Sequence, residues 1–253
     1  MSITRQLLLQ ELTDLLQPDK VNDYCPNGLQ IEGKPSIDSI ITGVTASQAL
    51  IDAAIVRKAD AVLVHHGYFW RGEAPALTGI KYRRIASLIK HDINLFAYHL
   101  PIDVHPTLGN NVQLGKILEI DGLHAVPSFV PEGIVFQGHY ALPKSSEEFT
   151  ALISRKLNRA PVVVGDSTRR IAKVAWCTGG GQSFIEQAVQ LGIDAFISGE
   201  ISEQTTHIAR ESGIFYCAAG HHATERYGVK AVGEHLASTL KVNVEFVDID
   251  NPA

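Results

Sequence analysis

The sequence has few cysteines, no excess of basic residues and no long apolar run, and each of these absences excludes a class of protein. The three cysteines lie far apart and form no CxxC pair, and Cys177 and Cys217 each stand in an apolar run. We therefore expect buried thiols in a reducing compartment rather than a disulfide framework. Lys and Arg number 22 against 27 Asp and Glu, and the formal charge of -5 leaves no basic footprint, so nucleic-acid binding is not expected.

The apolar runs are too short for a membrane protein. None reaches the roughly 18 residues that a membrane-spanning helix needs. The N-terminal segment MSITRQLLLQELTDLL lacks the apolar core and cleavage site of a signal peptide, and its pattern predicts an amphipathic helix. We expect a cytoplasmic protein with no membrane partner.

Short apolar strands alternate with helical patterns, which predicts an α/β fold with mixed, mostly parallel sheets. In the first half, the pattern predicts strands at 39–44, 61–64 and 93–98, and helices at 45–59 and 81–92. Either Thr45 or Ser47 is expected to cap the first of these helices. A stretch rich in Gly and Pro, about 121–145, is the candidate boundary between two α/β units, residues 1–125 and 126–253.

The second half repeats this plan, with strands at 172–178, 194–198 and 214–219 and helices at 181–192 and 202–213. When the halves are superposed, Asp60-Ala61 falls on Asp194-Ala195 and His65-His66 on Gly199-Glu200. After one inserted residue, His99 falls on His221 and Asp103 on Glu225. These spacings predict an internal duplication of one βαβαβ unit. A C-terminal helix (229–240) and strand (241–250) follow, and both are candidates for packing back on the first unit.

Metal-ligand side chains follow three of the predicted strands, at the ends where α/β sheets bind ligands. They are His65-His66, the pair His99 and Asp103, and the pair His221 and Glu225. Imidazole and carboxylate suit Zn, Fe, Ni or Mn. Adjacent strand residues point to opposite faces, so with a kink at Gly67 the tandem histidines could serve one ion each of a pair about 3.5–4 Å apart. Five ligands fill two such sites only if one carboxylate bridges.

Simpler interpretations remain open for each of these signals. A single histidine at a strand end is usually a hydrogen-bonded loop residue, and His221 with Glu225 could be an ordinary helical pair. The segment TGGGQS (178–183) could bind an anion at a helix N-terminus or serve only tight packing. The loop NDYCPNGLQIEG (22–33) could line a pocket with Asn27 and Gln30. The remaining histidines with no such context are expected to be structural or on the surface: His105, His124, His139, His207 and His222.

A set of motifs distributed over nearly the whole chain resembles the NIF-three-like family, also called GTP cyclohydrolase I type 2 homologues. The motifs are DYCPNGLQIEG, GVTAS, DAVLVHHGYFW, HLPID, CTGGGQSF, ISGEISEQTTH and AAGHHATE. The length is similar to that of the short bacterial members. The resemblance implies two related α/β units with a dinuclear metal site between them, assembled into a toroidal homohexamer.

The resemblance also assigns the ligands of two divalent ions per chain, which could be Zn, Fe, Mn or Ni. One ion would take His65, Asp103 and Glu225, and the other would take His66, His221 and the bridging Glu225. His99 lies near the ligands in the family pattern, and our hypothesis is that it is a catalytic acid or base.

The resemblance implies a metal-dependent hydrolase of a nucleotide or related heterocycle, with hydrolysis of the guanine ring of GTP as the reaction in the family name. Clearance of damaged nucleotides, a role suggested for relatives, would be a special case. The alternative hypothesis is a non-catalytic metal-binding scaffold that presents its surface to protein partners. An open coordination position would favour the enzyme.

Overall fold

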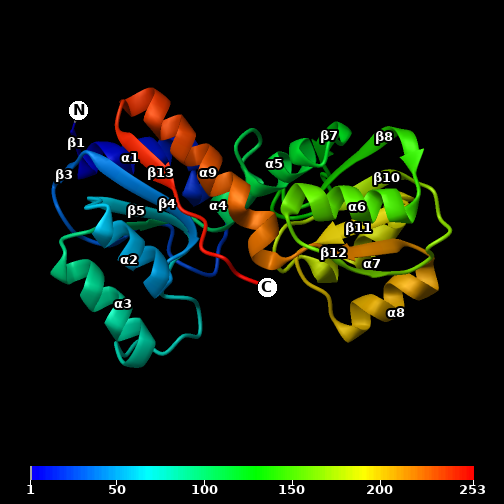
Figure 1. Cartoon of the computed structure of the whole chain (residues 1–253), viewed down its shortest axis with the longest axis horizontal. Helices are drawn as coiled ribbons and strands as arrows, with labels where there is room; N and C mark the ends of the chain where they lie inside the picture. Colours follow the sequence, from blue (N-terminus) through cyan, green and yellow to red (C-terminus); the bar gives the residue numbers. More distant parts are fainter. Residues whose placement is uncertain (1) are drawn as a thin grey trace. The chain divides into compact units, whose positions relative to one another are not determined.

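The computed structural model describes residues 2–253, which form two α/β units (Figure 1). The first unit contains the chain up to Ile102 together with Gly228–Asp250, and the second contains Asp103–Tyr227 and Asn251–Ala253. Two helices contain residues of both units: α4 (Leu100–Val104) and α9 (His221–Leu240). The expected α/β class with mixed sheets is confirmed.

The first unit is built on a five-stranded sheet in the order β13-β4-β5-β6-β2. Its strands are β2 (Gly28–Ile31), β4 (Ser39–Thr45), β5 (Ala61–His66), β6 (Asn94–Ala97) and β13 (Asn243–Phe246). All are parallel except β2, which runs antiparallel to β6. A small pair, β1 (Ile3–Thr4) and β3 (Ser36–Ile37), lies apart from this sheet.

Helices cover both faces of this sheet (Figure 1). They are α1 (Arg5–Leu16), η1 (Pro18–Lys20), α2 (Gln48–Val56) and α3 (Gly79–Lys90), with the C-terminal part of α9. Of the two expected caps, Ser47 caps α2, because its hydroxyl accepts from the Leu50 N–H. The core lies between the sheet and α2 with α3, where Leu50, Ile51 and Leu88 are buried against the strands. Because both faces are covered, residues 40–44 of β4 and 61–65 of β5 are all buried.

The second unit has a six-stranded sheet in the order β7-β8-β10-β11-β12-β9. Its strands are β7 (Asp121–Ala125), β8 (Phe136–Lys144), β9 (Val162–Val164), β10 (Ile171–Trp176), β11 (Ala195–Ser198) and β12 (Phe215–Ala218). The central three are parallel, and the outer three are antiparallel to their neighbours. The helices are α5 (Asn110–Ile117), α6 (Ser146–Leu157), η2 (Gln182–Phe184), α7 (Ile185–Ala188), η3 (Val189–Leu191) and α8 (Glu203–Ser212).

Two expectations about this unit need correction. The stretch 121–145 is not a linker, because it contains β7 and β8, which pair with each other and join the sheet through β10. Contacts divide the chain after Ile102 rather than at residue 125, since Val112, Leu114 and Leu118 lie in the second core. The helix expected over 181–192 is three short pieces, η2, α7 and η3, which end at Gly192 in a left-handed conformation.

The predicted duplication is visible in equivalent hydrogen bonds at the start of two strands. Asp60 precedes β5, and its carboxylate accepts from the N–H groups of Asp38 and Ser39, where β4 begins. Asp194 precedes β11, and its carboxylate accepts from two N–H groups at the start of β10. Each aspartate also binds a cation, Lys34 or Arg169. The repeated aspartate therefore fastens the same strand pair in both units.

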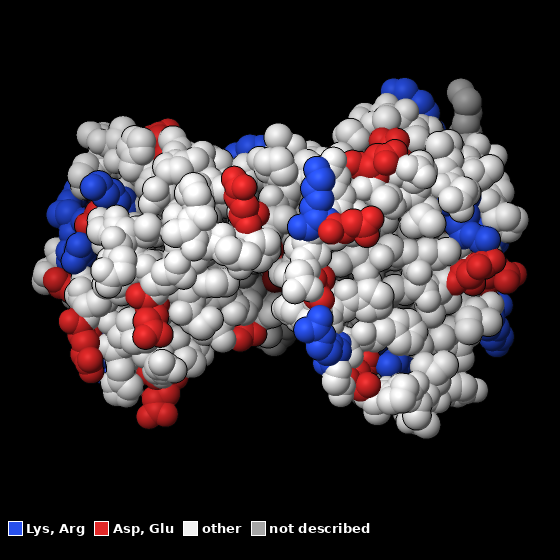
Figure 2. All heavy atoms as spheres, turned by 180° about the vertical axis from the view of Figure 1, so that it is seen from behind, with Lys and Arg blue, Asp and Glu red and all other residues white. Residues whose placement is uncertain are grey.

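Charge is dispersed on the surface. On the face drawn in Figure 2, Lys and Arg side chains lie singly or in small groups among Asp and Glu. Within residues 2–253, no helix combines the length and the apolar character that crossing a membrane requires.

Candidate metal centre

The tandem histidines belong to strand β5 itself, which extends two residues beyond its expected end. His65 is fully buried, and its ring centroid lies 4.5 Å from that of the half-buried His66. The Nδ1 atom of His65 lies 3.2 Å from the carbonyl oxygen of Tyr98. Because a carbonyl can only accept, this Nδ1 carries the proton, and Nε2 of the neutral ring keeps the lone pair that a metal requires.

His66 and the turn after it are fixed by neighbouring strands. Its Nδ1 lies 3.1 Å from Thr45 Oγ1, at the end of the adjacent strand β4. The next residue must be glycine, because a Cβ at Gly67 would overlap the Gln30 amide and lie 2.5 Å from Ala97 Cβ. Gln30 accepts from the Tyr68 N–H at 2.7 Å and donates to the Tyr68 carbonyl at 3.1 Å. Gln30 therefore anchors this turn.

His99 is held by two residues of the loop 22–33. Its backbone N–H donates to Asn27 Oδ1 at 2.7 Å, and its Nδ1 lies 3.0 Å from Asp23 Oδ1. The Asp23 carboxylate also accepts from the N–H of Leu100 and from the side chain of Asn27. Burial acts to raise the pKa of Asp23, but the hydrogen bond and charge of His99 and the other donors lower it to about 2. Asp23 is therefore ionised at neutral pH and orients His99 so that Nε2 faces away from it.

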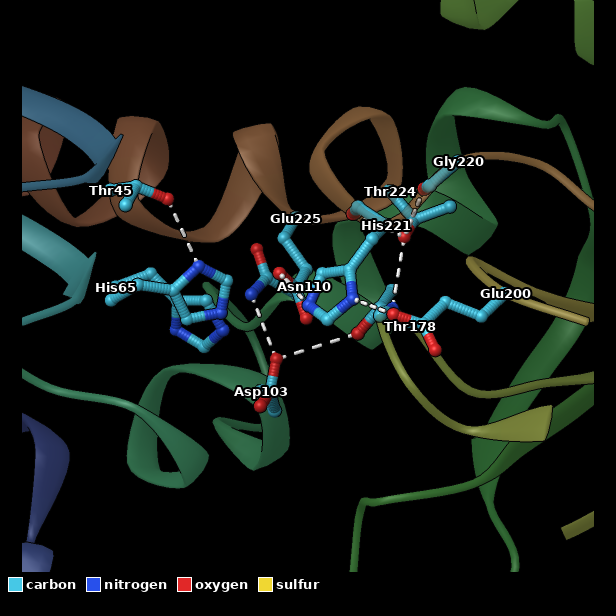
Figure 3. A network of polar contacts seen from close by, with 12 residues as sticks. Thr45, His65, Asp103, Asn110, Thr178, Glu200, Gly220, His221, Thr224 and Glu225 are labelled. Atoms are coloured by element: carbon cyan, nitrogen blue, oxygen red, sulfur yellow. Dashed lines mark hydrogen bonds and ion pairs between the residues drawn. The ribbon is translucent and has the colours of Figure 1, made fainter. Parts of the chain in front are cut away.

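In the second unit, Asp103 is buried and its carboxylate is held by two side chains (Figure 3). Its Oδ1 accepts from Asn110 Nδ2 at 2.8 Å and from Thr178 Oγ1 at 3.4 Å. Asn111 braces the same region, since its amide accepts from the Thr178 N–H and donates to the carbonyl of Gly133. These contacts hold Oδ1 of the Asp103 carboxylate in place.

His221 lies between two carboxylates at the start of α9. Its Nδ1 is 2.7 Å from Glu200 Oε1, and its Nε2 is 3.1 Å from Glu225 Oε2 (Figure 3). Burial acts to lower the pKa of His221, but the two glutamates outweigh it and raise the pKa to about 9. Two donors to one tetrahedral ion are about 3.0–3.5 Å apart, so His221 Nε2 and Glu225 have the spacing of ligands to the same metal.

The glycine-rich segment 178–183 makes room for Glu225. Gly179 has φ +60°, and a Cβ there would overlap Glu225 Oε1 and lie 3.2 Å from His221 Nε2. Its N–H donates to Thr224 Oγ1 at 3.0 Å, which holds the segment against α9. The helical pieces after it are too short to make an N-terminal anion site. Of the two roles considered for this segment, the structure supports tight packing.

The structure brings together the predicted ligands that share a unit. In the first unit, one ligand atom from each of His65, His66 and His99 lies within 4.8 Å of the others. In the second unit, carboxylate oxygens of Asp103 and Glu225 lie within the same distance. These donor sets of imidazole and carboxylate suit divalent Zn, Fe or Mn, so the residues present fit the metals that the resemblance implies.

Sequence reasoning missed two residues that orient these side chains, Asp23 and Glu200. Asp23 lies in a loop quoted above, yet no pattern links it to a histidine 76 residues away. Glu200 follows strand β11 and carried a signal, because the duplication aligns it with the second tandem histidine. Within residues 2–253, the five histidines expected to be structural or on the surface belong to neither of these two clusters. Among them, His124, His139 and His207 are exposed.

The cysteines are all free thiols, and Cys177 and Cys217 are buried as expected. Burial, together with the charges of Asp103 and Glu225, raises the pKa of Cys177. The sheets and side chains thus define an α/β protein with clusters of His, Asp and Glu suited to a divalent metal.

The chain belongs to the Duf34/NIF3 family (NGG1p interacting factor 3), which it matches over residues 3–252. It is 54% identical to a relative from Vibrio cholerae, over 95% of this chain and 96% of the relative. It is 49% identical to a relative from Pseudomonas aeruginosa over 100% of both chains. Both relatives are named GTP cyclohydrolase 1 type 2 homolog.

Solved structures show the same fold. Protein ybgI, described as being of unknown function, has a TM-score of 0.92 at 47% identity, covering 99% of this chain and 100% of its own. A protein from Thermus thermophilus has a TM-score of 0.90 at 28% identity, with the same coverage.

Proposed function

We propose that the protein is a metal-dependent hydrolase of a nucleotide or related heterocycle. In this proposal His65, Asp103 and Glu225 hold one divalent ion, and His66, His221 and Glu225 hold a second. Support for the substrate class comes from relatives of 54% and 49% sequence identity, which are named GTP cyclohydrolase 1 type 2 homolog.

One observation carries the proposal: each proposed ligand is oriented by a neighbour within its own unit. Four have a partner for an atom that need not coordinate, and these partners are the Tyr98 carbonyl, Thr45, Asn110 and Glu200. The fifth, Glu225, lies against a glycine that leaves space for its carboxylate. Such orienting contacts are typical of side chains that bind a metal. Histidines without a function would not require them.

Held by these residues, two divalent ions would supply Lewis acidity that activates water and polarises the group under attack. His99 would act as the general base, accepting a proton at Nε2 while Asp23 holds the Nδ1–H. The ionised Asp23 stabilises the imidazolium that forms, because its pKa of about 2 keeps it charged at neutral pH. His99→Ala should then lose turnover and keep its metal.

The test is metal content per chain in protein purified without added metal or chelator. Wild type should carry about two ions, Glu225→Ala near none, and His65→Ala about one, because only Glu225 would serve both ions. His124→Ala, which removes an exposed histidine outside the clusters, is the matched control and should equal wild type. Equal loss in the Glu225 and His65 variants would contradict the bridge. A wild type that refuses added Mn, Fe or Zn would contradict the metal site and favour the scaffold.

Assembly and location belong to the same proposal. We propose a homohexameric ring that clears damaged nucleotides, as the resemblance implies, and a cytoplasmic location, as the cysteines and the N-terminal segment indicate. Native mass measurement tests the assembly, since a monomer at working concentration would reject it. The formal charge of -5 argues against a ring that encircles nucleic acid.

A further inference from the structure

Two aromatic side chains of the first unit lie beside the candidate imidazoles. The rings of Tyr24 and Trp70 are 5.8 Å apart, and each meets the ring of His99 edge to face at 5.0 Å. Trp70 also lies 6.0 Å from His66. Tyr24 is 49% exposed, although a tyrosine that served only packing would be covered. This Tyr24–Trp70 pair thus offers aromatic surface next to the proposed metal ligands.

The backbone that presents Trp70 is held in an unfavourable conformation. Phe69 has φ +68°, which is rare for a bulky side chain. The N–H groups of Phe69 and Trp70 both donate to Glu73 Oε2, at 3.1 and 3.2 Å. Lys81 pairs with Glu73 at 2.9 Å and lies over the Phe69 ring. Strain maintained by such contacts is found where a side chain must be placed for a purpose.

Arg71 connects the aromatic pair to the loop that orients His99. Arg71 donates its backbone N–H to the Tyr24 carbonyl at 2.8 Å and its guanidinium to the Asp23 carbonyl at 3.1 Å. Asp23 in turn holds the His99 ring. Tyr24, Trp70 and His99 are therefore fixed relative to one another, as a preorganised binding surface requires.

We propose that the Tyr24–Trp70 pair is a stacking platform for the planar base of the substrate. The two rings are too close for a base to enter between them, so the base lies on the exposed surface of the pair. Stacking on aromatic side chains is tolerant of base identity, and losing one platform ring should weaken binding about 10–100-fold. A catalytic role for the platform rests on the proposed function. Binding of a base to the platform does not require a metal.

The experiment uses guanosine as the probe and the chain's own tryptophan fluorescence as the signal. The only other tryptophan, Trp176, is fully buried and donates to the Asn111 carbonyl, so it should not respond. Guanosine should quench chelator-treated wild type, whereas ribose 5-phosphate, which has no base, should not. The quench should vanish in Trp70→Leu. Tyr24→Leu should weaken guanosine binding about 10–100-fold and Tyr24→Phe should restore it.

Tyr82→Leu is the matched control, because it removes another exposed tyrosine of the same unit and should leave the affinity unchanged. Metal content separates this inference from the proposed function. Both platform variants should keep the wild-type metal, so a Tyr24→Leu variant with wild-type metal and wild-type guanosine affinity would overturn the platform alone. A quench that depends on Trp70 in a protein that never takes up metal would support the platform and reject the metal hydrolase.

Discussion

The sharpest perturbation of the proposed centre is a single methyl group at Gly179. In Gly179→Ala the new Cβ would overlap Glu225 Oε1 and lie 2.8 Å from Glu225 Cδ. Carbon atoms rest about 3.5–4.0 Å apart, so the carboxylate must retreat by on the order of 1 Å. The left-handed φ of +60° adds a backbone cost of about 1–2 kcal/mol for alanine. With about 1–3 kcal/mol for overpacking, the free energy of unfolding should fall by about 2–5 kcal/mol.

Metal affinity should suffer separately, because the displaced carboxylate is the proposed bridging ligand. A ligand with disturbed support typically loses about 10–100-fold in affinity. The assay is competition with a chromogenic chelator, at a temperature where circular dichroism shows the variant to be folded. Gly180→Ala is the control, since the nearest atoms to a Cβ there lie 3.9 Å away and its φ is not left-handed. It should change stability by no more than about 0.5 kcal/mol.

The two variants together can refute the reasoning. If Gly179→Ala binds metal as tightly as Gly180→Ala while remaining folded, the carboxylate of Glu225 either does not bind metal or does not depend on this space. If both variants lose stability equally, the left-handed backbone and the overlap at position 179 are not the cause.

Three further changes test the packing around the site and the sheets. Gly67→Ala should lower the free energy of unfolding by about 1–3 kcal/mol in urea melts, because its Cβ would overlap the Gln30 amide; an unchanged midpoint would reject that close approach. Asn111→Ala should cost about 2–4 kcal/mol, since it strands buried donors and acceptors; a loss under 1 kcal/mol would contradict this. Burial acts to raise the pKa of Asp194, but two β10 N–H groups and Arg169 lower it. Its contribution to stability is therefore complete above the unfolded pKa of about 4 and is lost as pH falls through the folded pKa, so Asp194→Asn should show a weaker acid dependence in melts from neutral to low pH.

Local sequence patterns could predict the central strands and the positions of the candidate ligands. Four apolar residues before His65 require a buried strand, and the spacing from His99 to Asp103 recurs from His221 to Glu225. Each of these signals depends on neighbours within a few residues, and the structure retains all of them. The same patterns predicted that β5 would end two residues too early. A histidine interrupts an apolar run but does not end the hydrogen bonds of the strand.

Features that depend on distant partners could not be predicted. The bond from Asp23 to His99 joins residues 76 apart, and only the packing of β2 beside β6 brings them together. Strands β8 and β9 were missed because β9 has only three residues and β8 carries a proline and a glycine, which are usual signals of a loop. Residues 182–191 likewise have a helical pattern of apolar residues in the sequence. That pattern does not reveal that the helix is divided into three short pieces.

Stability and candidate chemistry are separated along the strands. Asp60 and Asp194 make equivalent hydrogen bonds at the starts of their strand pairs. The strand ends differ, because the position of His66 in one half corresponds to Glu200 in the other, where Glu200 orients His221. Ligands of α/β sheets bind at those ends, so they can change without loss of the fold. Substituting either aspartate should therefore cost stability with little loss of metal, whereas Glu200→Gln should weaken metal binding with little loss of stability.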